Sequence, residues 1–344
     1  GASMLATILL AATLANSALD VRVDAAEAEH VLALLELRAA GAVPSDRDFA
    51  SLFATEGYVR LKQREAAMMR PFTDAEFRAF VESDDVLARR AALATALGRW
   101  KRADLVGAAA RAARYLPADA RLRATVYLVI KPRPNSFVFE LTTSPAIFFA
   151  VGAEDLSPAA IENTVAHELH HVGAASLDTA VERRLLALPE PRRTAAEWTG
   201  AFSEGIAVLA AAGGPRVHPH AASAPSARAR WDVDAGRAEE DLRAVETFLL
   251  EVARGRLAGD AIASRGYRFH SDGDRPQGAW YTLGWRMAAL VEEELGRDAV
   301  VACVADPPRL LASYQRVARR RIAAGERWPL WSAELLEAIG AENP

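Results

Sequence analysis

The sequence predicts a mostly α-helical protein of the α+β class with one small β-sheet. Two observations predict it. Apolar residues recur at helical spacing over most of the chain, in stretches rich in Ala, Leu and Arg. Between residues 124 and 151, by contrast, β-branched and aromatic residues gather in short runs separated by Pro, Asn, Thr and Ser, as in strands joined by turns.

A short extended piece at 19–23 leads into an amphipathic helix that ends near Gly41, with an apolar side made of Val31, Leu32, Leu34 and Leu35. Further helices are expected at 74–82 and 85–115. The sheet is expected to be mainly antiparallel, with strands at 124–130, 136–141 and 146–151. The helical pattern returns after Ser157 and is interrupted at 213–235 and at about 271–278.

No internal repeat and no sharp change of composition divides the chain of 344 residues. A single domain over 19–344 is therefore expected, helical to about residue 120 and with a second part from about 121 onward. Residues 1–3 look like a tag remnant. The apolar stretch at 4–18 is either the core of a secretory signal or a first helix, so export and a cytoplasmic location both stay open.

The composition excludes several classes of protein. Acidic and basic residues are interleaved with a net charge of −4, so the basic surface of a nucleic-acid binder is missing. No run outside 4–18 approaches the ~20 apolar residues of a membrane span. The single cysteine, Cys303, excludes a disulfide within the chain and a thiolate-rich metal site. A bound metal would need His and carboxylate ligands.

Such ligands occur in the segment 167–171, which reads His-Glu-Leu-His-His and matches the pattern H-E-x-x-H. Side chains four apart lie on one face of an α-helix, so His167 and His171 can meet at one metal ion. Glu168 lies at the edge of that face, where it can act as the catalytic base. The alternative is that these are ordinary histidines on the surface of a helix.

The surrounding sequence independently predicts a helix. Ser157 suits the N-cap position, Pro158 the first turn, and an apolar stripe runs along Ile161, Val165, Leu169 and Val172. The helix follows the last expected strand through a short loop, and we expect the sheet to pack on it. His170 lies off the metal-facing side, either behind it or in solvent.

A catalytic zinc usually has three protein ligands, so one more must come from elsewhere. One known continuation of the motif has a glycine at 174 and supplies the third ligand from a histidine at 177. This chain has Ala174 and Leu177 at those positions, so that source of the third ligand is excluded. Asp178 is one position late for the equivalent carboxylate and stays an alternative. Glu204 fits better, on a helix expected to open with a capping box of Thr194 and Glu197.

That helix is expected to end at Gly213 and Gly214. Small residues around Glu204 would let it approach the histidine helix closely, namely Gly200, Ala201, Gly205 and Ala207. Its other side is expected to supply core contacts, from Phe202, Ile206 and Leu209.

HELHH followed by a helix with Ser-Glu-Gly-Ile-Ala at 203–207 resembles the gluzincin group of zinc metallopeptidases. The stretches 280–288 and 291–297 further resemble an uncharacterised set of bacterial zinc-dependent peptidases. The likeness covers about residues 120–320 and is specific only at the metal motif. It implies a zincin-like fold, a Zn²⁺ ion held by His167, His171 and Glu204, and a peptide or protein substrate.

In such an enzyme Glu168 takes a proton from the attacking water and passes it to the leaving amine. Tyr281 is the first candidate to stabilise the oxyanion and His270 the second, although core positions are the simpler explanation for both. An edge strand at 136–141 or 146–151 could pair with an extended peptide.

His218 and His220 are either a separate metal site or solvated histidines in a loop, and that loop is a candidate lid. A zinc peptidase is the leading hypothesis. The alternatives are an inactive zincin-like binding or scaffold protein, and a metal-dependent hydrolase of non-peptide amides or esters. The sequence leaves open the endo- or exopeptidase mode and the oligomeric state.

Overall fold

The computed structural model describes residues 19–341 except 134, 142 and 274. The apolar start at 4–18, expected to be a leader or a first helix, lies outside the described residues. The described residues form two compact units, the first within residues 19–106 and 122–162 and the second within residues 107–121 and 163–341. The single domain expected over 19–344 stays a prediction.

The first unit contains a sheet of four described strands in the order β1-β2-β4-β3. Their bounds are β1 Leu19–Asp24, β2 Leu122–Val129, β3 Phe137–Phe139 and β4 Ala146–Ala150. Strand β2 is parallel to both β1 and β4, and only β3 is antiparallel to its neighbour β4.

The mainly antiparallel sheet expected from the sequence is therefore wrong. The extended piece at 19–23 pairs with a strand about a hundred residues later, across a series of helices, and such a crossover joins parallel strands. Strands β2 and β4 are separated by the excursion that contains β3, so they too run in the same direction. Of the two segments considered for pairing with a peptide, β3 lies at the edge and β4 is paired on both sides.

Six of the described helices lie wholly in the first unit: α1 Ala26–Ala39, α2 Asp46–Phe53, α3 Glu56–Ala67, α4 Asp74–Val81, α5 Asp84–Ala88 and α6 Arg90–Arg102. Helix α7 Leu105–Ala113 begins in this unit and continues in the second. The one long helix expected at 85–115 is in fact three. Ser83 caps α5, and the extended backbone of Ala103 ends α6. Residues rich in Ala, Leu and Arg continue across both breaks, so helical periodicity alone does not reveal them.

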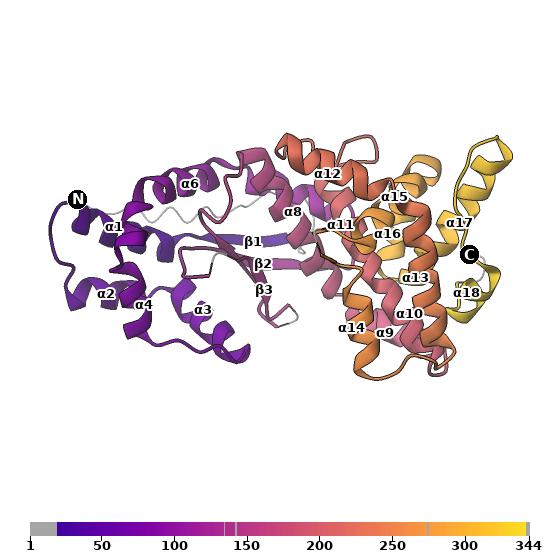
Figure 1. The fold of residues 1–344 in the computed structure, drawn as a ribbon, viewed down its shortest axis with the longest axis horizontal. Coiled ribbons are helices and arrows are strands. Elements are labelled where there is room, and N and C mark those ends of the chain that lie inside the picture. Colours follow the sequence, from indigo (N-terminus) through magenta and orange to yellow (C-terminus); the bar gives the residue numbers. More distant parts are fainter. Residues whose placement is uncertain (1–18, 134, 142, 274, 342–344) are drawn as a thin grey trace. The chain divides into compact units, whose positions relative to one another are not determined.

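Helices cover both faces of the sheet (Figure 1). A side chain at Gly57 of α3 would contact Tyr127 and Val129, so α3 lies against the face that carries them. Phe149 points to the opposite face of its strand from Phe148, which stacks on Tyr127. Phe149 contacts Trp100 of α6, with ring centroids 4.8 Å apart. The two central strands, β2 and β4, are mostly buried on both sides, as their near-continuous apolar sequences require.

The described residues of the second unit form helices joined by loops, with no strand among them. This unit contains most of α8 Pro158–Ala175. The elements that follow are α9 Asp178–Leu185, α10 Arg192–Trp198, the 3₁₀ turn Thr199–Phe202, α11 Ser203–Ala212, α12 Pro225–Ala235, α13 Ala238–Ala253, α14 Asp260–Tyr267, α15 Ala279–Leu295, α16 Arg297–Val304, α17 Pro307–Ala323 and α18 Ala333–Ala338. The interruption expected at 213–235 is shorter than predicted, because Pro225 stands in the first turn of α12 and starts a helix instead of preventing one.

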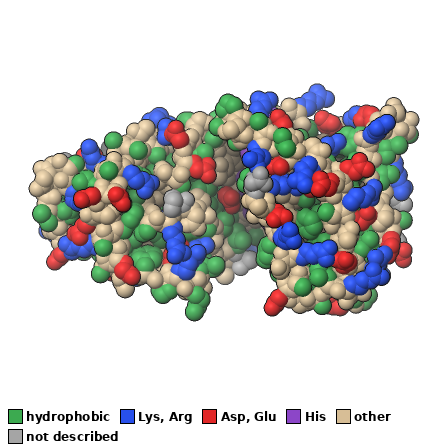
Figure 2. Space-filling model, viewed as in Figure 1, with side chains coloured by type: hydrophobic (Ala, Val, Ile, Leu, Met, Phe, Trp, Pro, Cys, Tyr) green, Lys and Arg blue, Asp and Glu red, His purple; other side chains and the backbone are tan. Residues whose placement is uncertain are grey.

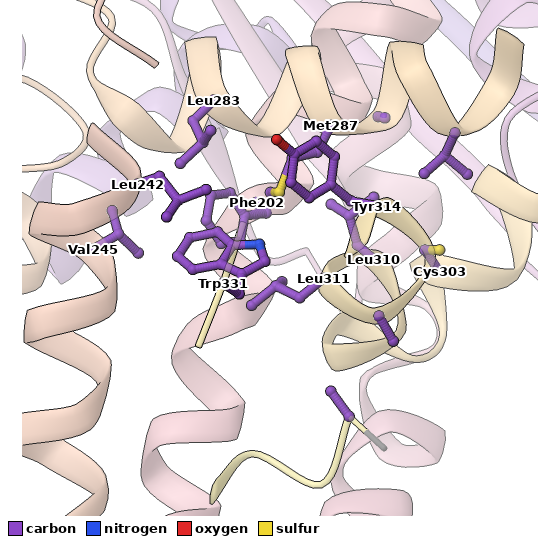
Figure 3. Close-up of a cluster of buried hydrophobic side chains, with 14 of the residues drawn as sticks. Phe202, Leu242, Val245, Leu283, Met287, Cys303, Leu310, Leu311, Tyr314 and Trp331 are labelled. Atoms are coloured by element: carbon purple, nitrogen blue, oxygen red, sulfur yellow. The ribbon is translucent and has the colours of Figure 1, made fainter. Parts of the chain in front are cut away.

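The core of the second unit lies between α13, α15 and α17 (Figure 3). Phe202 and Trp331 meet there with ring centroids 6.2 Å apart, and Met287 and Leu311 are fully buried beside them. Cys303, 1% exposed, belongs to the same core. The central helix of this core is α15, whose first half also carries Tyr281.

On the visible face of each unit, acidic and basic side chains are intermixed (Figure 2). This agrees with the interleaved charges of the sequence. Within the part of the chain that the structure describes, no helix combines the length and the apolar character needed to cross a membrane.

Buried Glu27 gives the first unit a distinctive pH dependence. It is 1% exposed, its Oε2 atom accepts a hydrogen bond from the Ile130 N–H at 2.8 Å, and its Oε1 atom has no partner. Burial raises the pKa of Glu27 from 4.5 to about 8. Between pH 4.5 and about 8, Glu27 is protonated in the folded protein and ionised in the unfolded chain. The contribution of Glu27 to stability is therefore fully present below pH 4.5 and is lost as the pH rises through about 8.

Glu27→Gln should remove this loss, which amounts to at most about 1.4 kcal/mol per pH unit within that window. The free energy of unfolding, measured by urea denaturation from pH 5 to pH 9, checks it. Glu29→Gln on the same helix is the control, because Glu29 is half exposed and pairs with Lys101 at the surface. Parallel pH profiles for wild type and Glu27→Gln would contradict the expected role of Glu27.

Candidate metal centre

Helix α8 carries the H-E-x-x-H segment. The Ser157 hydroxyl oxygen accepts a hydrogen bond from the Ala160 N–H at 3.2 Å, as expected of an N-cap. The expected apolar stripe is buried, each of its four residues being at most 1% exposed: Ile161, Val165, Leu169 and Val172. The burial of this stripe fixes the rotation of the helix about its axis. His167 and His171 then share one face, with their Nε2 atoms 3.1 Å apart.

Glu204 reaches the same point from α11. The segment before it differs from the prediction, because α10 begins at Arg192 and a 3₁₀ turn separates it from α11. Thr194 lies inside α10, where its N–H and hydroxyl both donate to Glu190, so the expected capping box of Thr194 and Glu197 is wrong. The end of α11 at Gly213 is as expected, with a left-handed φ of 88° that favours glycine.

One of the small residues near Glu204, Gly205, contacts a helix other than the one expected. A Cβ atom at Gly205 would lie 2.1 Å from the backbone carbonyl carbon of Gly284, so α11 contacts α15 backbone to backbone. A Cβ atom at Gly284 would lie 3.2 Å from the Cα of Gly205, a tight contact but less severe than the one at Gly205. Gly205 therefore brings α11 against α15 and not against the histidine helix. Because Glu204 precedes Gly205 and Tyr281 lies one turn before Gly284, this contact places the two side chains together.

Three ligand-type atoms converge at this site. Oε2 of Glu204 lies 3.1 Å from Nε2 of His167 and 3.0 Å from Nε2 of His171. Among the described residues, these three form the one group of His, Cys, Asp or Glu side chains that could hold a metal ion.

The donor set suits zinc. Atoms bound tetrahedrally at ~2.0–2.1 Å from one zinc ion lie about 3.3 Å from each other, close to the spacing seen here. Two imidazoles and one carboxylate are also a common set for a catalytic zinc, which keeps its fourth position open. The three residues present therefore fit the metal.

The electrostatics of the cluster keep Glu204 ionised. Its side chain is 17% exposed, and burial alone would raise its pKa. The adjacent His171 and His167 outweigh burial and hold the pKa of Glu204 well below its usual range. In return, Glu204 raises the pKa of His171 against the effect of burial. An ionised carboxylate between two imidazoles is the form that coordinates a cation.

Tyr281 and His270, the two candidates for oxyanion stabilisation, both lie at this cluster. The Tyr281 ring stacks on His167 with centroids 6.1 Å apart and planes 14° apart. Nδ1 of His270 lies 3.7 Å from Oε1 of Glu204. Burial and the charges of Glu204 and Glu168 raise the pKa of Tyr281, so its phenol keeps its proton and can donate a hydrogen bond.

His170 lies behind the metal-facing side chains. The alternative that it faces solvent is wrong, because the residue is 0% exposed. Burial lowers the pKa of His170 to about 3, so the ring is neutral. Its Nε2 lies 3.2 Å from the carbonyl oxygen of Tyr115, which can only accept, so Nε2 carries the proton. The Tyr115 hydroxyl in turn donates to Glu292 at 2.9 Å. Sequence reasoning missed Tyr115, because nothing in its local sequence points to α8.

Arg275 is a second residue that the sequence did not single out. Its guanidinium forms two hydrogen bonds to Asp241, at 2.8 and 2.6 Å, and a third to the Thr282 hydroxyl at 3.0 Å. The side chains of Arg275 and Asp241 are 11% and 7% exposed. The pair ties the segment after His270 to α13 and to the residue next to Tyr281. Arg275 therefore positions both candidates, although its sequence context indicates only a loop.

The remaining candidates do not join the cluster. Asp178 opens α9 and is not among the converging ligand atoms. His218 pairs with Asp232 at 2.8 Å, and His220 lies 2.8 Å from the Gln277 side-chain oxygen. His218 and His220 each bind a different partner, and the described residues contain no second metal-type group that includes them.

Comparison with models of known protein families gives a match. The model of a protein family described as "Putative zinc dependent peptidase" matches residues 49–321, which include every residue of the candidate centre. No curated protein and no solved structure matches the chain.

The backbone contact between α11 and α15 predicts a severe effect for Gly205→Ala. The added methyl group would overlap Gly284 and Trp285 backbone atoms, so we expect a loss of about 2–3 kcal/mol in the free energy of unfolding. Metal affinity should fall as well, because Glu204 is displaced. Denaturation curves and zinc titration measure the two effects.

Gly98→Ala in α6 is the matched control. Its methyl group would meet only the flexible end of Arg102, so the substitution should be neutral or stabilising by up to about 1 kcal/mol. Equal tolerance of both substitutions would show that the two helices are not in close contact at Gly205.

Proposed function

Because the chain belongs to the DUF5700 family, described as "Putative zinc dependent peptidase", we propose that it hydrolyses peptide bonds with a zinc ion held by His167, His171 and Glu204. The observation that carries the proposal is the convergence of these three side chains from α8 and α11, with the facing atoms 3.0–3.1 Å apart. The gluzincin-type, zincin-like arrangement expected from the sequence is part of this proposal.

Bound zinc would polarise the scissile carbonyl and lower the pKa of a water molecule. Glu168 is the proposed general base. It follows His167 directly on α8, is half-buried, and lies near enough for its charge to raise the pKa values of Tyr281 and His171. Its carboxylate accepts a proton from the attacking water and delivers it to the leaving amine.

Tyr281 is proposed to donate a hydrogen bond to the oxyanion that forms from the carbonyl. Its phenol is protonated and is held beside His167 by the packing of α15 on α11. His270 is the second candidate, because its ring is 6.1 Å from that of Tyr281 and its Nδ1 atom faces Glu204. A donor fixed in place before the reaction lowers the barrier more than one that must reorient.

Zinc content and hydrolysis together test the proposed function. We expect about one zinc per chain by elemental analysis. Glu168→Gln should keep the metal, since Glu168 is not one of the three ligands, and should lose about 10²–10⁴-fold in kcat because the base is removed. Glu182→Gln, exposed on α9, is the control and should leave both quantities unchanged.

Each of the other outcomes would indicate a different function for this protein. Absence of zinc would refute the metal centre. Zinc without cleavage of any peptide, but with hydrolysis of simple esters or amides, would indicate a hydrolase of non-peptide substrates. Zinc with no hydrolysis at all would indicate an inactive binding or scaffold protein.

The two oxyanion candidates can be separated by Tyr281→Phe and His270→Gln. Tyr281→Phe removes only the hydroxyl, so kcat should fall about 10²–10³-fold while zinc content and KM stay close to wild type. His270→Gln should cost less. Steady-state kinetics measure both, with Tyr58→Phe as the control, because Tyr58 donates to Asp74 in the first unit. The reverse order of effects would assign the donor to His270.

A further inference from the structure

A row of rings leads away from the candidate metal centre. The His167 ring lies 6.1 Å from the Tyr281 ring, which lies 6.1 Å from that of His270. The His270 ring in turn lies 5.8 Å from that of Tyr267, the last residue of α14. Each step is within the range of direct aromatic contact. The row therefore runs without interruption from a metal-facing histidine to Tyr267.

Tyr267 is unusually exposed for its type. It is 62% exposed. Among the described residues, every other Phe, Tyr and Trp is buried or partly buried. Tyr267 is not part of the buried cluster of the second unit, so packing in that core does not require its ring. An exposed aromatic ring beside a catalytic centre is typical of a surface that binds a ligand.

The ring of Tyr267 is nevertheless held in place. It meets Trp198 edge to face, with centroids 5.8 Å apart. A Cβ atom at the preceding Gly266 would lie 2.4 Å from the Trp198 ring, so the end of α14 rests directly on that indole. Trp198 is itself packed on Phe248. Tyr267 is thus supported from behind while its outer side stays open, which keeps the entropy cost of ligand binding low.

The charges around Tyr267 are compensated. Arg265 forms an ion pair with Glu251, and Arg268 lies 3.2 Å from Asp272. The two cations that flank the ring in sequence are therefore both paired with carboxylates. An uncharged, apolar ligand group fits these surroundings better than an acidic or a basic one.

We propose that Tyr267, supported by Trp198, forms a subsite that takes an aromatic or large aliphatic side chain of the peptide substrate, within about three residues of the bond that is cleaved. The inference rests on the proposed function. His270 lies 3.7 Å from Glu204, and its ring lies 5.8 Å from that of Tyr267. The subsite is therefore within roughly 11 Å of the metal centre, a distance that about three residues of extended peptide span. Tyr267 is a specificity residue and takes no part in the chemical step.

Pairs of peptides test this subsite with the zinc-loaded protein. The two peptides of a pair differ only in Phe or Ala at one of about three positions on either side of the cleaved bond, and the pair with the largest preference defines the subsite. Wild type should prefer the Phe peptide in kcat/KM. Tyr267→Ala should reduce that preference about tenfold, chiefly through KM, because the stacking and apolar contact are lost. Tyr267→Phe should retain it. Zinc content and kcat/KM for the Ala peptide should stay at wild-type values in both variants.

Calorimetry provides a readout that needs no turnover. A hydroxamate inhibitor with a Phe side chain should bind wild type more tightly than its Ala counterpart, and Tyr267→Ala should abolish most of the difference. Leu186→Ala is the control, because Leu186 is an apolar residue with nearly the same exposure, 61%, and lies between α9 and α10. It should leave the preference unchanged.

The possible failures are distinguishable. An unchanged Phe preference in a Tyr267→Ala variant that binds zinc and cleaves peptides would overturn the subsite and leave the proposed function intact. A wild-type protein without zinc or hydrolysis would refute the proposed function, and the subsite with it.

Discussion

The backbone contact between α11 and α15 is the constraint on which the candidate centre depends. Gly205 approaches the backbone of Gly284 and Trp285 so closely that its position has no room for a side chain, and a Cβ atom at Gly284 would make unusually tight contacts. Glu204 and Tyr281 lie beside these two glycines, so the position of the carboxylate and that of the phenol are set by a single helix crossing. A site built on packed helices in this way keeps its geometry better than one built on loops.

The second constraint is electrostatic. A buried carboxylate and two imidazoles stabilise one another, and the burial of Arg275 against Asp241 is possible only because the guanidinium is paired and hydrogen-bonded. Arg275 also fixes the segment that joins His270 to the start of α15. The centre is therefore supported from three sides: by the apolar stripe of α8, by the crossing of α11 and α15, and by this buried ion pair.

Chemistry and specificity are carried by different elements in this proposal. Helices α8 and α11 supply the metal-facing residues, α15 supplies Tyr281, and the end of α14 supplies the exposed ring of Tyr267. Because Tyr267 touches the centre only through the His270 ring, it can change in a relative without altering the metal ligands. This separation lets a conserved reaction act on different substrates.

The sequence by itself determined the parts of the site that are local. The spacing of His167 and His171 and the stripe from Ile161 to Val172 follow from helical periodicity, which is a property of neighbouring residues. Most strands and the end of α11 at Gly213 were predictable for the same reason. Glu204 could be proposed as the third ligand-type residue, but only its position in the fold brings it to 3.0 Å from His171.

Only the tertiary structure decided which surfaces meet. It directed Gly205 to α15 and not to α8, made the sheet mostly parallel, buried His170 and brought Arg275 and Tyr267 to the centre. These contacts join residues far apart in the chain. They depend on shape and burial over whole helices, so a local pattern of residue types does not predict them.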